Sequence, residues 1–145
     1  MPTATTVTSK HFDELTTREF HDLLRLRIDV FVVEQTCPYP ELDGRDVERG
    51  TEHHWTADDG APTCYARTLD EGDAIRIGRV VTAPDARGTG LAAALMTQLI
   101  ERYGDRALVL DAQSHLADWY GRFGFTPDGD EFVEDGIPHV PMRRG

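Results

Sequence analysis

The hydrophobic positions of the chain fall into stretches of helical spacing separated by stretches of extended spacing. The first helical stretch runs from about Thr17 to Val32, and Thr16 with Glu19 forms a capping-box pattern at its start. Leu15 and Phe20 are placed to act as a hydrophobic staple around that cap. The apolar residues at helical spacing are Phe20, Leu23, Leu24, Ile28 and Phe31. The pattern predicts an amphipathic helix with one face in the core.

Three strands are expected after this helix. The segment that follows Val33, EQTCPYPELDGRD, is rich in Pro, Gly and acidic residues and predicts a loop or a broken helix. Turn signals then occur at Asp59-Gly60 and at Glu71-Gly72-Asp73. The segments between them carry β-branched and aromatic residues and predict strands at His53–Ala57, Thr63–Leu69 and Ala74–Thr82. Together they predict a meander.

Helical spacing returns in the second half of the chain. A helix is expected from Thr89 to Tyr103, and Gly104 supplies its C-terminal stop. Its apolar stripe consists of Leu91, Leu95, Leu99 and Ile100. A strand, a glycine-containing turn and a helix therefore follow one another between Ala74 and Tyr103.

The last third of the chain predicts a short strand, a short helix and a hairpin. Ala107–Leu110 is an apolar strand, and Ser114 can cap a helix that ends near Phe123. Two further strands are expected in Phe125–Met142, joined by a turn at Asp135-Gly136. The total is six or seven strands and three or four helices. Because no repeat or linker divides the 145 residues, they predict one α/β (α+β) domain over residues 1–145.

The charge of the chain changes which partners are expected. Its formal net charge is −11 at pH 7. Nucleic acids and anionic membranes bind through clustered Lys and Arg, so neither is an expected partner. An acidic protein would instead attract a cationic acceptor such as an amine.

The two ends of the chain and its cysteines bear on location. No apolar run approaches the roughly 20 residues of a membrane span, and the opening MPTATTVTSK lacks the apolar part of a secretory signal. We therefore expect a soluble, cytoplasmic protein in which Cys37 and Cys64 stay reduced and unbridged. His53 and His54 are neighbours on a predicted strand and face opposite sides, so they cannot share a metal ion, and no metal site is expected.

The most informative segment is IGRVVTAPDARGTGLAAALM, residues 77–96. It combines a strand, a turn opened by Pro84, and glycines that open a helix. Free backbone N–H groups and the positive end of the helix dipole meet at such a turn, and glycine lets an anion approach the backbone. The alternative interpretation is a purely structural turn whose glycines serve tight packing.

Two other nucleotide-binding motifs fit this turn poorly. A Walker loop needs a Lys after its glycines, and the chain has a single lysine, Lys10. A dinucleotide-binding fingerprint needs three glycines, whereas Gly88-Thr89-Gly90 is followed by an alanine at the third position, Ala93.

RGTGLA, Arg87 to Ala92, resembles the pyrophosphate-binding motif of the GNAT acetyltransferases. The resemblance implies that the turn holds the pyrophosphate of acetyl-CoA and that the strand before it faces the pantetheine arm. The residues implied are Val80, Val81, Thr82, Arg87, Gly88, Thr89, Gly90, Leu91, Ala92 and also Tyr120. The family's fold is a mixed, mostly antiparallel sheet of six or seven strands flanked by helices, with a splayed central strand pair that holds the cofactor.

A second family feature lies one strand and one helix later. WYGRFGF, residues 119–125, is similar to the GNAT segment in which a helix with a tyrosine ends at a glycine followed by Phe. Tyr120 is the matching tyrosine, and its alternative role is simple aromatic packing. The closer resemblance is to the ElaA-like branch. It rests on FVVEQTCPYPELDG, AQSHL and EDGIPHVPM, residues 31–44, 112–116 and 134–142.

The resemblance implies transfer of an acetyl group from acetyl-CoA to a primary amine by direct attack in a ternary complex. Tyr120 is the expected general acid, because a phenol can share its proton with the leaving thiolate. The strand Ala74 to Val81 carries no carboxylate of the kind that often acts as base in the family. The candidate bases are therefore Glu34, His53 and His139.

The acceptor side is predicted from charge. Glu34, Glu41 and Asp43 lie in an irregular acidic segment, which we expect to form one wall of the amine pocket, facing His139. The alternatives are a solvated acidic loop, a catalytically silent acyl-CoA-binding module on the same fold, and an interaction protein whose turn binds nothing. The sequence leaves the acceptor and the oligomeric state open, and a homodimer is a common state of soluble proteins.

Overall fold

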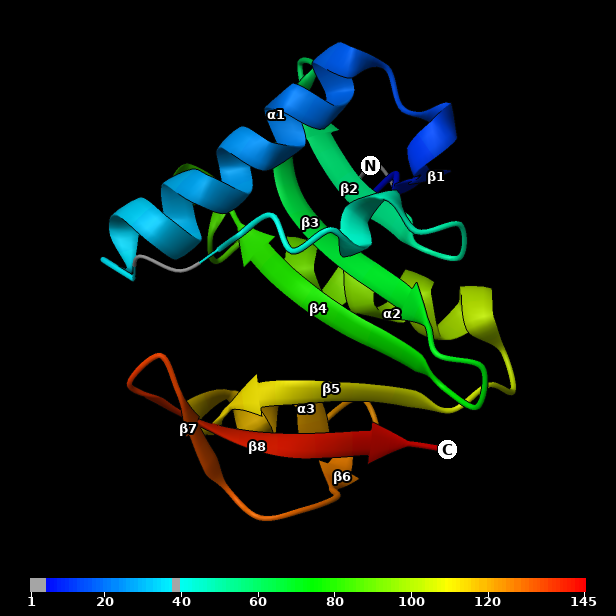
Figure 1. The fold of residues 1–145 in the computed structure, drawn as a ribbon, viewed down its shortest axis with the longest axis vertical. Helices are drawn as coiled ribbons and strands as arrows, with labels where there is room; N and C mark the ends of the chain where they lie inside the picture. Colours follow the sequence, from blue (N-terminus) through cyan, green and yellow to red (C-terminus); the bar gives the residue numbers. More distant parts are fainter. Residues whose placement is uncertain (1–4, 38–39) are drawn as a thin grey trace.

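The computed structural model describes residues 5–37 and 40–145 and contains one eight-stranded sheet. The strand order is β1-β2-β3-β4-β5-β8-β6, and β7 pairs with β8 off this path (Figure 1). The strands are β1 (Thr8–His11), β2 (Glu52–Asp58), β3 (Ala61–Asp70), β4 (Ile75–Thr82), β5 (Leu108–Gln113), β6 (Thr126–Pro127), β7 (Phe132–Glu134) and β8 (Ile137–Arg144). Neighbours are antiparallel except β4 and β5, which are parallel. This is the mixed, mostly antiparallel α/β class that the sequence predicts.

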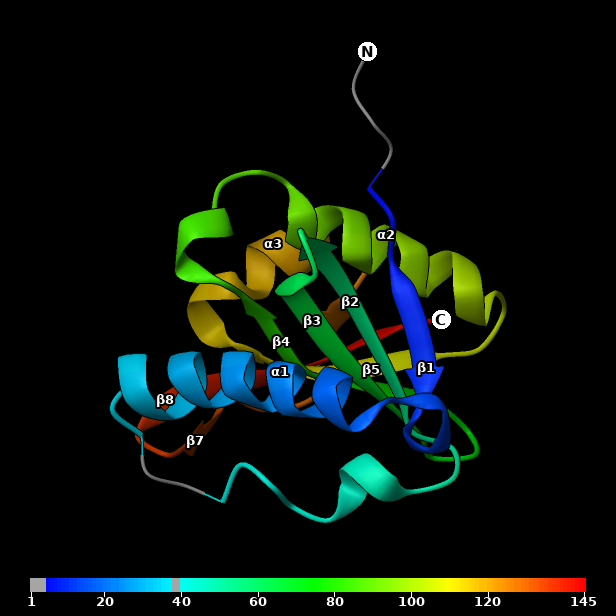
Figure 2. The same cartoon turned by 90° about the horizontal axis from the view of Figure 1, so that it is seen from above.

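Helices cover both faces of the sheet. α1 lies along one face, whereas α2 and α3 lie on the opposite face (Figure 2). Their bounds are α1 (Thr17–Ile28), α2 (Leu91–Tyr103) and α3 (Ala117–Gly121). A π-helix, η2 (Asp29–Glu34), continues α1, and short 3-10 turns are η1 (Phe12–Glu14), η3 (Arg45–Val47), η4 (Pro84–Ala86) and η5 (Ser114–Leu116). Within the described ranges, none of the helices is long and apolar enough to cross a membrane.

The start of α1 follows from its predicted cap. The Thr16 hydroxyl accepts a hydrogen bond from the Glu19 amide at 3.0 Å, and the Glu19 carboxylate accepts one from the Thr16 amide at 2.9 Å. The helix then packs its apolar side on β3 and β4. The core residues on this face are Leu23, Leu26, Val30, Trp55, Tyr65 and Val81.

A second core lies under α2 and α3. The buried α2 residues Leu95, Met96 and Leu99 pack on the middle of the sheet, and Tyr120 and Phe125 close the core from the α3 side. The strand residues in this core include Cys64, Ala66, Ile75, Ile77, Leu108, Leu110 and Met142. The sheet is therefore buried on both faces at β3 and β4.

Two of the predicted turns have the backbone that their residues favour. Asp59 and Gly60 have φ values of +53° and +84°, and Asp135 and Gly136 have +52° and +77°. Positive φ at both central residues is the conformation that Asp-Gly hairpins adopt. These turns set the β2–β3 and β7–β8 registers, with Asp58 opposite Ala61 and Glu134 opposite Ile137.

Some boundaries differ from the prediction. The strand count is eight, because β1 and the two-residue β6 carry no alternating apolar pattern that would reveal them. β5 continues to Gln113 rather than ending at Leu110. The helix expected from Ser114 to Phe123 is a 3-10 turn followed by the five residues of α3.

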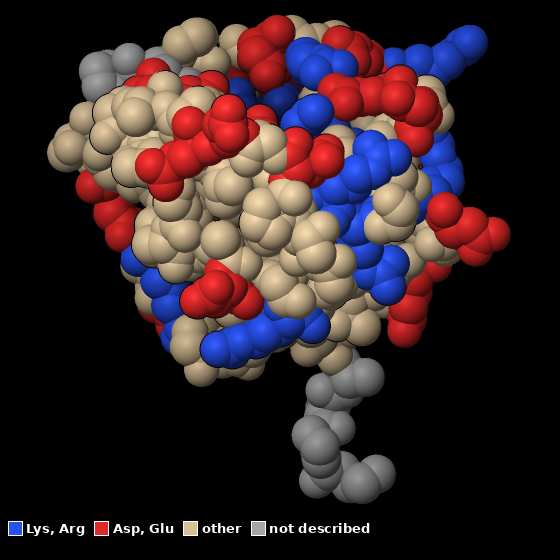
Figure 3. Space-filling model, turned by 90° about the horizontal axis from the view of Figure 1, so that it is seen from below, with Lys and Arg blue, Asp and Glu red and all other residues tan. Residues whose placement is uncertain are grey.

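Charged side chains at one end of the sheet are paired within the protein. Figure 3 shows the molecule from below, with Lys and Arg side chains gathered on the right of this face beside Asp and Glu side chains. At the end of the sheet where β4 and β5 begin, Arg106 pairs with Asp70 at 2.8 Å, and Arg76 pairs with Glu71 at 3.0 Å. Hydrogen bonds from Arg106 and from the Gly72 amide to the Asp70 carboxylate lower its pKa to about 2.

His53 and His54 are fully buried on opposite faces of β2, as their alternation predicts. The Tyr65 hydroxyl lies 2.6 Å from His53 Nδ1, and the Asp46 carbonyl lies 3.0 Å from Nε2. His54 contacts the Ser9 hydroxyl through Nδ1 at 2.7 Å and the Thr68 hydroxyl through Nε2 at 2.8 Å. Burial lowers the pKa of both rings, that of His54 to about 3, so both are neutral in the folded protein at pH 7.

The two rings predict a loss of stability in mild acid. Between about pH 6.5 and the lowered folded values, the unfolded chain binds protons at these rings and the folded protein does not, so acid favours unfolding. From pH 6 to 5, the free energy of unfolding should fall by up to about 1.4 kcal/mol per pH unit for His54, and the lowered pKa of His53 adds to this fall. Denaturant unfolding at a series of pH values measures this slope.

A matched pair of variants assigns the slope to the buried rings. His54→Gln should remove the part of the slope that comes from this ring, whereas replacing the exposed His21 by Gln should leave the slope unchanged. A free energy of unfolding that stays flat between pH 6 and 5 would contradict neutral, buried rings at these positions.

Candidate functional site

The central feature of the sheet is a parallel strand pair that separates. β4 and β5 pair only at their first residues, Ile75 with Leu108 and Arg76 with Val109. Beyond these pairs the two strands diverge toward their C-terminal ends (Figure 1). β4 stays paired with β3 on its other side, and β5 stays paired with β8. The inner edges of both strands can therefore offer main-chain groups to a ligand between them.

A β-bulge interrupts β4 within the divergent part. The register with β3 shifts between the Tyr65–Val81 and Arg67–Gly78 pairs. Arg79 lies at the bulge with φ = +55°, a left-handed conformation that costs a non-glycine residue roughly 1–2 kcal/mol. Bulges redirect the strand that follows and are common beside active sites. Here the strand that follows is the predicted cofactor strand, residues 80–82.

The predicted anion turn lies between the end of β4 and α2. Gly88 and Gly90 have φ values of +78° and +81°, and Gly90 is the N-cap of α2. The Thr89 hydroxyl donates to the Ala86 carbonyl at 2.6 Å and fixes the turn. A Cβ added at either glycine would meet no atom within 4 Å, so the turn is open to solvent.

The start of α2 gives this turn its electrostatic character. The amides of the first helical residues, which include Leu91 and Ala92, have no acceptor within the helix. They add to the positive end of the dipole of a 13-residue helix. An exposed, glycine-lined helix start of this kind fits a phosphate or pyrophosphate group.

Arg87 carries a positive charge at the same turn and is paired across 53 residues with Glu34. The two guanidinium nitrogens donate to the two carboxylate oxygens at 2.7 Å each, and Arg87 Nε donates to the Thr82 carbonyl at 3.3 Å. The pairing lowers the pKa of Glu34 and raises that of Arg87. Glu34, at the end of η2, thus contacts the predicted cofactor turn itself.

Tyr120 lies across the divergence from β4 on α3 and is 7% exposed. Its ring packs edge-on against Trp119 and Phe125. Burial first, and the nearby Cys64 thiol second, raise its pKa to about 12, so the phenol is protonated at neutral pH. Cys64 belongs to the same core cluster as Tyr120, and its Sγ lies 3.5 Å from the Thr82 hydroxyl at the end of β4.

His139 lies on β8 opposite Gln113, at the same end of the sheet as the C-terminus of β5. Its ring stacks on Phe132 with 5.6 Å between centroids. Nδ1 lies 2.8 Å from the Ile137 carbonyl, which can only accept a hydrogen bond, so Nδ1 carries the proton. This tautomer leaves the Nε2 lone pair available as a base.

His53 has a different environment from the one that its candidate role requires. Its side chain is fully buried, and both ring nitrogens are engaged within the protein. An acceptor amine could not reach it without opening the core. We therefore do not retain His53 in the proposed site.

The acidic segment between Glu34 and Asp43 does not present the free negative charge that we predicted. Pro38 and Tyr39 of this segment lie outside the described residues. Glu41 is only 4% exposed and forms ion pairs with Arg27 and Arg79. Asp43 is paired with Arg67 and Arg79, and these contacts lower its pKa. Burial first, and the charge of Asp135 in the β7–β8 turn second, raise the pKa of the Cys37 thiol.

The sequence analysis did not predict these arginine–carboxylate pairs. A signal was present, since Arg27 lies four residues after Leu23, on the stripe that faces the core. A charged residue at such a position implies a buried partner of opposite charge. Arg27 is in fact fully buried, with Glu41 and Asp46 as its partners.

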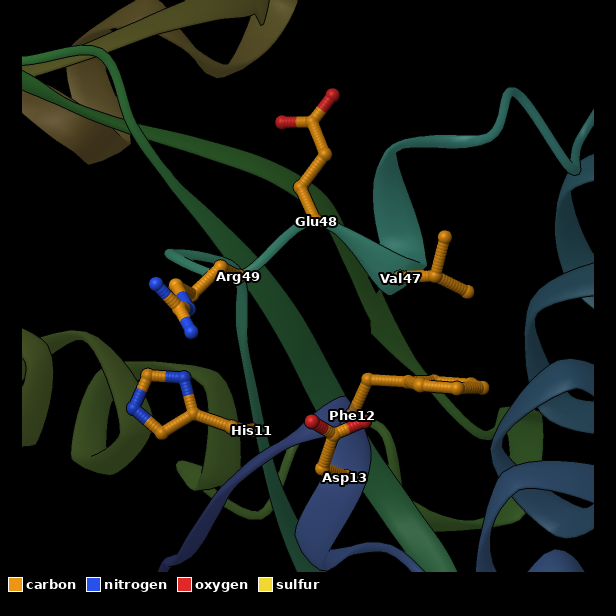
Figure 4. Close-up of a pocket in the computed structure, with 6 residues that line it drawn as sticks. All are labelled: His11, Phe12, Asp13, Val47, Glu48 and Arg49. Atoms are coloured by element: carbon orange, nitrogen blue, oxygen red, sulfur yellow. The ribbon is translucent and has the colours of Figure 1, made fainter.

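Two surface hollows lie elsewhere. One of about 330 Å³ is lined by side chains from the end of β1, from η1 and from the segment before β2 (Figure 4). Its lining residues are His11, Phe12, Asp13, Val47, Glu48 and Arg49. The other, of about 480 Å³, lies between α1, the β2–β3 turn and Ala83-Pro84. Neither is lined by the glycine turn or by Tyr120. Among residues 5–37 and 40–145, His, Cys, Asp and Glu form no group of three or more that could hold a metal ion.

Comparison with known proteins decides the family. The model of the acetyltransferase (GNAT) domain matches residues 22–144. The chain belongs to the GNAT acetyltransferases. The match includes the divergent strands, the glycine turn and Tyr120, and it confirms the family predicted from the RGTGLA and WYGRFGF segments. The protein is accordingly an enzyme of the N-acetyltransferase class.

Individual relatives agree with this membership. A UPF0039 protein of Mycobacterium tuberculosis is 48% identical over 136 residues, which cover 90% of this chain and 87% of the relative. Protein ElaA of Escherichia coli is 38% identical over 143 residues, which cover 92% of each chain. An acyl-CoA N-acyltransferase from Pseudomonas aeruginosa has a TM-score of 0.91 at 44% identity, covering 97% of this chain and 99% of that one. The predicted GNAT fold and the ElaA-like resemblance are both confirmed.

Proposed function

We propose that this enzyme transfers an acetyl group from acetyl-CoA to a primary amine, by direct attack of the amine while both substrates are bound. The observation that carries the proposal is the open glycine turn at the start of α2, beside the divergent end of β4. The similarity to a solved acyl-CoA N-acyltransferase supports it. In this reaction an N–C bond forms and the C–S bond of the thioester breaks, while the amine loses a proton and the thiolate gains one.

The pyrophosphate of acetyl-CoA would be held by Arg87, Gly88, Thr89, Gly90, Leu91 and Ala92. The fit rests on three properties of the turn: left-handed glycines, open space above them and unpaired helix-start amides. Arg87 adds a fixed positive charge. Its carboxylate partner Glu34 must share it with the incoming phosphates, so cofactor binding and the Glu34 contact are linked.

The main chain of β4 would hold the rest of the cofactor. Val80, Val81 and Thr82 follow the bulge and have no β5 partner, so their backbone groups can face the pantetheine arm and the thioester oxygen. A backbone N–H at this edge would stabilise the negative charge that develops on that oxygen. Acetyl-CoA itself supplies the activated acyl group.

Tyr120 would donate a hydrogen bond to the leaving thiolate. With its pKa near 12, it is a much weaker acid than a thiol near 8.5. Full proton transfer from the phenol is therefore uphill, and the favoured role is a hydrogen bond that stabilises the thiolate until it gains its proton.

His139 is the better of the two remaining base candidates. Its Nδ1 is tied to a carbonyl, so Nε2 can accept a proton, and the side chain is only partly buried. Glu34 is ion-paired with Arg87 on the cofactor side, and this pairing lowers its basicity. We assign the amine proton to His139 and the tuning of cofactor binding to Glu34.

The cofactor site is tested by placing a carboxylate in the turn. Gly90→Glu puts negative charge and bulk where the pyrophosphate would bind, so acetyl-CoA binding should be lost in titration calorimetry. Gly72→Glu is the matched control, because Gly72 has a similar φ of +87°, equally open surroundings and a position on the β3–β4 turn. It adds the same charge and the same backbone strain, and it should bind acetyl-CoA normally. Equal affinities in the two folded variants would refute the assigned turn.

Tyr120→Phe should keep the fold and the affinity for acetyl-CoA but lower kcat by roughly 10²- to 10³-fold, because it removes one hydrogen-bond donor to the developing negative charge. Tyr103→Phe is the control. Tyr103 is partly buried and its pKa is likewise raised to about 12, but its hydroxyl contacts Thr68 and Glu52. Steady-state rates should fall for Tyr120→Phe alone, and equal rates in wild type and Tyr120→Phe would return Tyr120 to a packing role.

Glu34→Gln and His139→Gln separate the two base candidates. His139→Gln should lower kcat and remove the acidic limb of the pH–rate profile, because the base that must be unprotonated is gone. Glu34→Gln should keep that limb and tighten acetyl-CoA binding about two- to fivefold, because Arg87 loses its competing partner. A limb lost in Glu34→Gln and kept in His139→Gln would reverse the assignment.

The acceptor is best found with a panel of primary amines, scored by release of the CoA thiol. A protein that binds acetyl-CoA tightly but releases no thiol with any amine would favour a catalytically silent acyl-CoA-binding module instead.

A further inference from the structure

A buried charge cluster joins α1 and the segment after η2 to the bulge of β4. Its centre is Arg27, whose side chain is fully buried. Arg27 Nε donates to Glu41 Oε2 at 2.6 Å, and its Nη1 donates to Asp46 Oδ1 at 2.8 Å. Its Nη2 donates to the Glu41 carbonyl at 3.3 Å. The cluster therefore fixes both the side chain and the main chain of Glu41.

Glu41 also contacts the bulge. The same Oε2 atom that accepts from Arg27 accepts from Arg79 Nε at 3.1 Å, and the Glu41 carbonyl accepts from Arg79 Nη2 at 3.1 Å. Arg79 Nη2 further donates to Asp43 Oδ2 at 3.4 Å. Asp43 is itself held by two 2.9 Å hydrogen bonds from Arg67 on β3. The Arg79 side chain is thus held at several points.

The backbone at Arg79 needs such support. Of the four non-glycine residues with positive φ in the described part of the chain, Thr36, Asp59 and Asp135 lie in turns, and Arg79 alone lies within a strand. A left-handed long-chain residue persists only where its surroundings determine its conformation. The contacts of the Arg79 guanidinium supply this constraint, because they fix the direction in which its side chain leaves the backbone.

We propose that the Arg27–Glu41–Arg79 bridge is a positioning device that holds the β4 bulge in its left-handed conformation and so aims the main chain of residues 80–82 into the divergence. Arg79 and Glu41 act through the backbone of β4 and not by contact with the substrates. The catalytic part of this inference rests on the proposed function, since the aimed backbone is the part that would face the thioester. The structural part, an ordered bulge, does not depend on it.

Hydrogen exchange and kinetics of Arg79 variants test the two parts separately. Arg79→Ala removes the bridge and leaves a strained residue, whereas Arg79→Gly removes the bridge and tolerates the positive φ. In both, amides of the β4 segment 78–82 should exchange at least about tenfold faster. The kcat should fall about 10- to 100-fold with little change in the KM for acetyl-CoA, as expected for a misplaced reacting group.

Arg76→Ala is the matched control on the same strand. Arg76 pairs at the surface with Glu71 and Asp111 and does not contact the bridge. This variant should keep wild-type exchange at 78–82 and wild-type kcat. If both short Arg79 variants fail to fold, Arg79→Lys decides: it keeps the charge, cannot make the forked contacts, and should still show faster exchange and a kcat lowered several-fold.

Unchanged exchange of segment 78–82 in folded Arg79 variants would overturn the positioning role. Faster exchange with wild-type kcat would overturn its catalytic part. Failure of the wild-type enzyme and Arg76→Ala to acetylate any amine, with exchange faster in the Arg79 variants alone, would support the bridge and count against the proposed function.

Discussion

The parallel pairing of β4 and β5 ends after two residue pairs, and the remaining features of the site depend on this separation. A continuous parallel pair would satisfy its main-chain groups within the sheet and leave nothing for a ligand. Once the strands diverge, β4 keeps its partner on one side and presents its other edge. The crossover through α2 then places a glycine turn and a helix start beside that edge, while α3 brings Tyr120 from the opposite side.

The two faces of the sheet are held by different interactions, and this difference bears on function. The α2 face is mostly an apolar core. On the α1 face, an apolar cluster is joined by the buried Arg27, Glu41 and Asp46. Apolar contacts tolerate small shifts, whereas paired charges in a dry environment fix distance and direction. The β4 bulge contacts these charged residues through Arg79. The part of β4 whose backbone position matters most is therefore held by the most directional contacts.

The sequence predicts the elements that local patterns specify. The α1 cap, the Asp-Gly hairpins and the helical stripe of α2 each depend on residues close together in the chain, and the structure contains all three. The strand β1 was missed because TSKH, at the sheet edge, has no apolar alternation. Glu41 and Asp43 pair with arginines 14 to 38 residues away. Spacing could not predict this pairing, because the sequence of an acidic loop does not show whether its charges are solvated or paired. The divergence of β4 and β5 came from the family resemblance, and no periodicity in the chain indicates it.

The proposed function requires acetyl-CoA to bind between the divergent strands and against the start of α2. Hydrogen exchange of the wild-type protein with and without acetyl-CoA measures this directly, because bound cofactor protects the amides that it contacts. If acetyl-CoA binds there, the protected amides should be concentrated in residues 78–94, with weaker protection near Tyr120. Protection confined to the hollow at His11 and Arg49, or to the hollow between α1 and the β2–β3 turn, would contradict it.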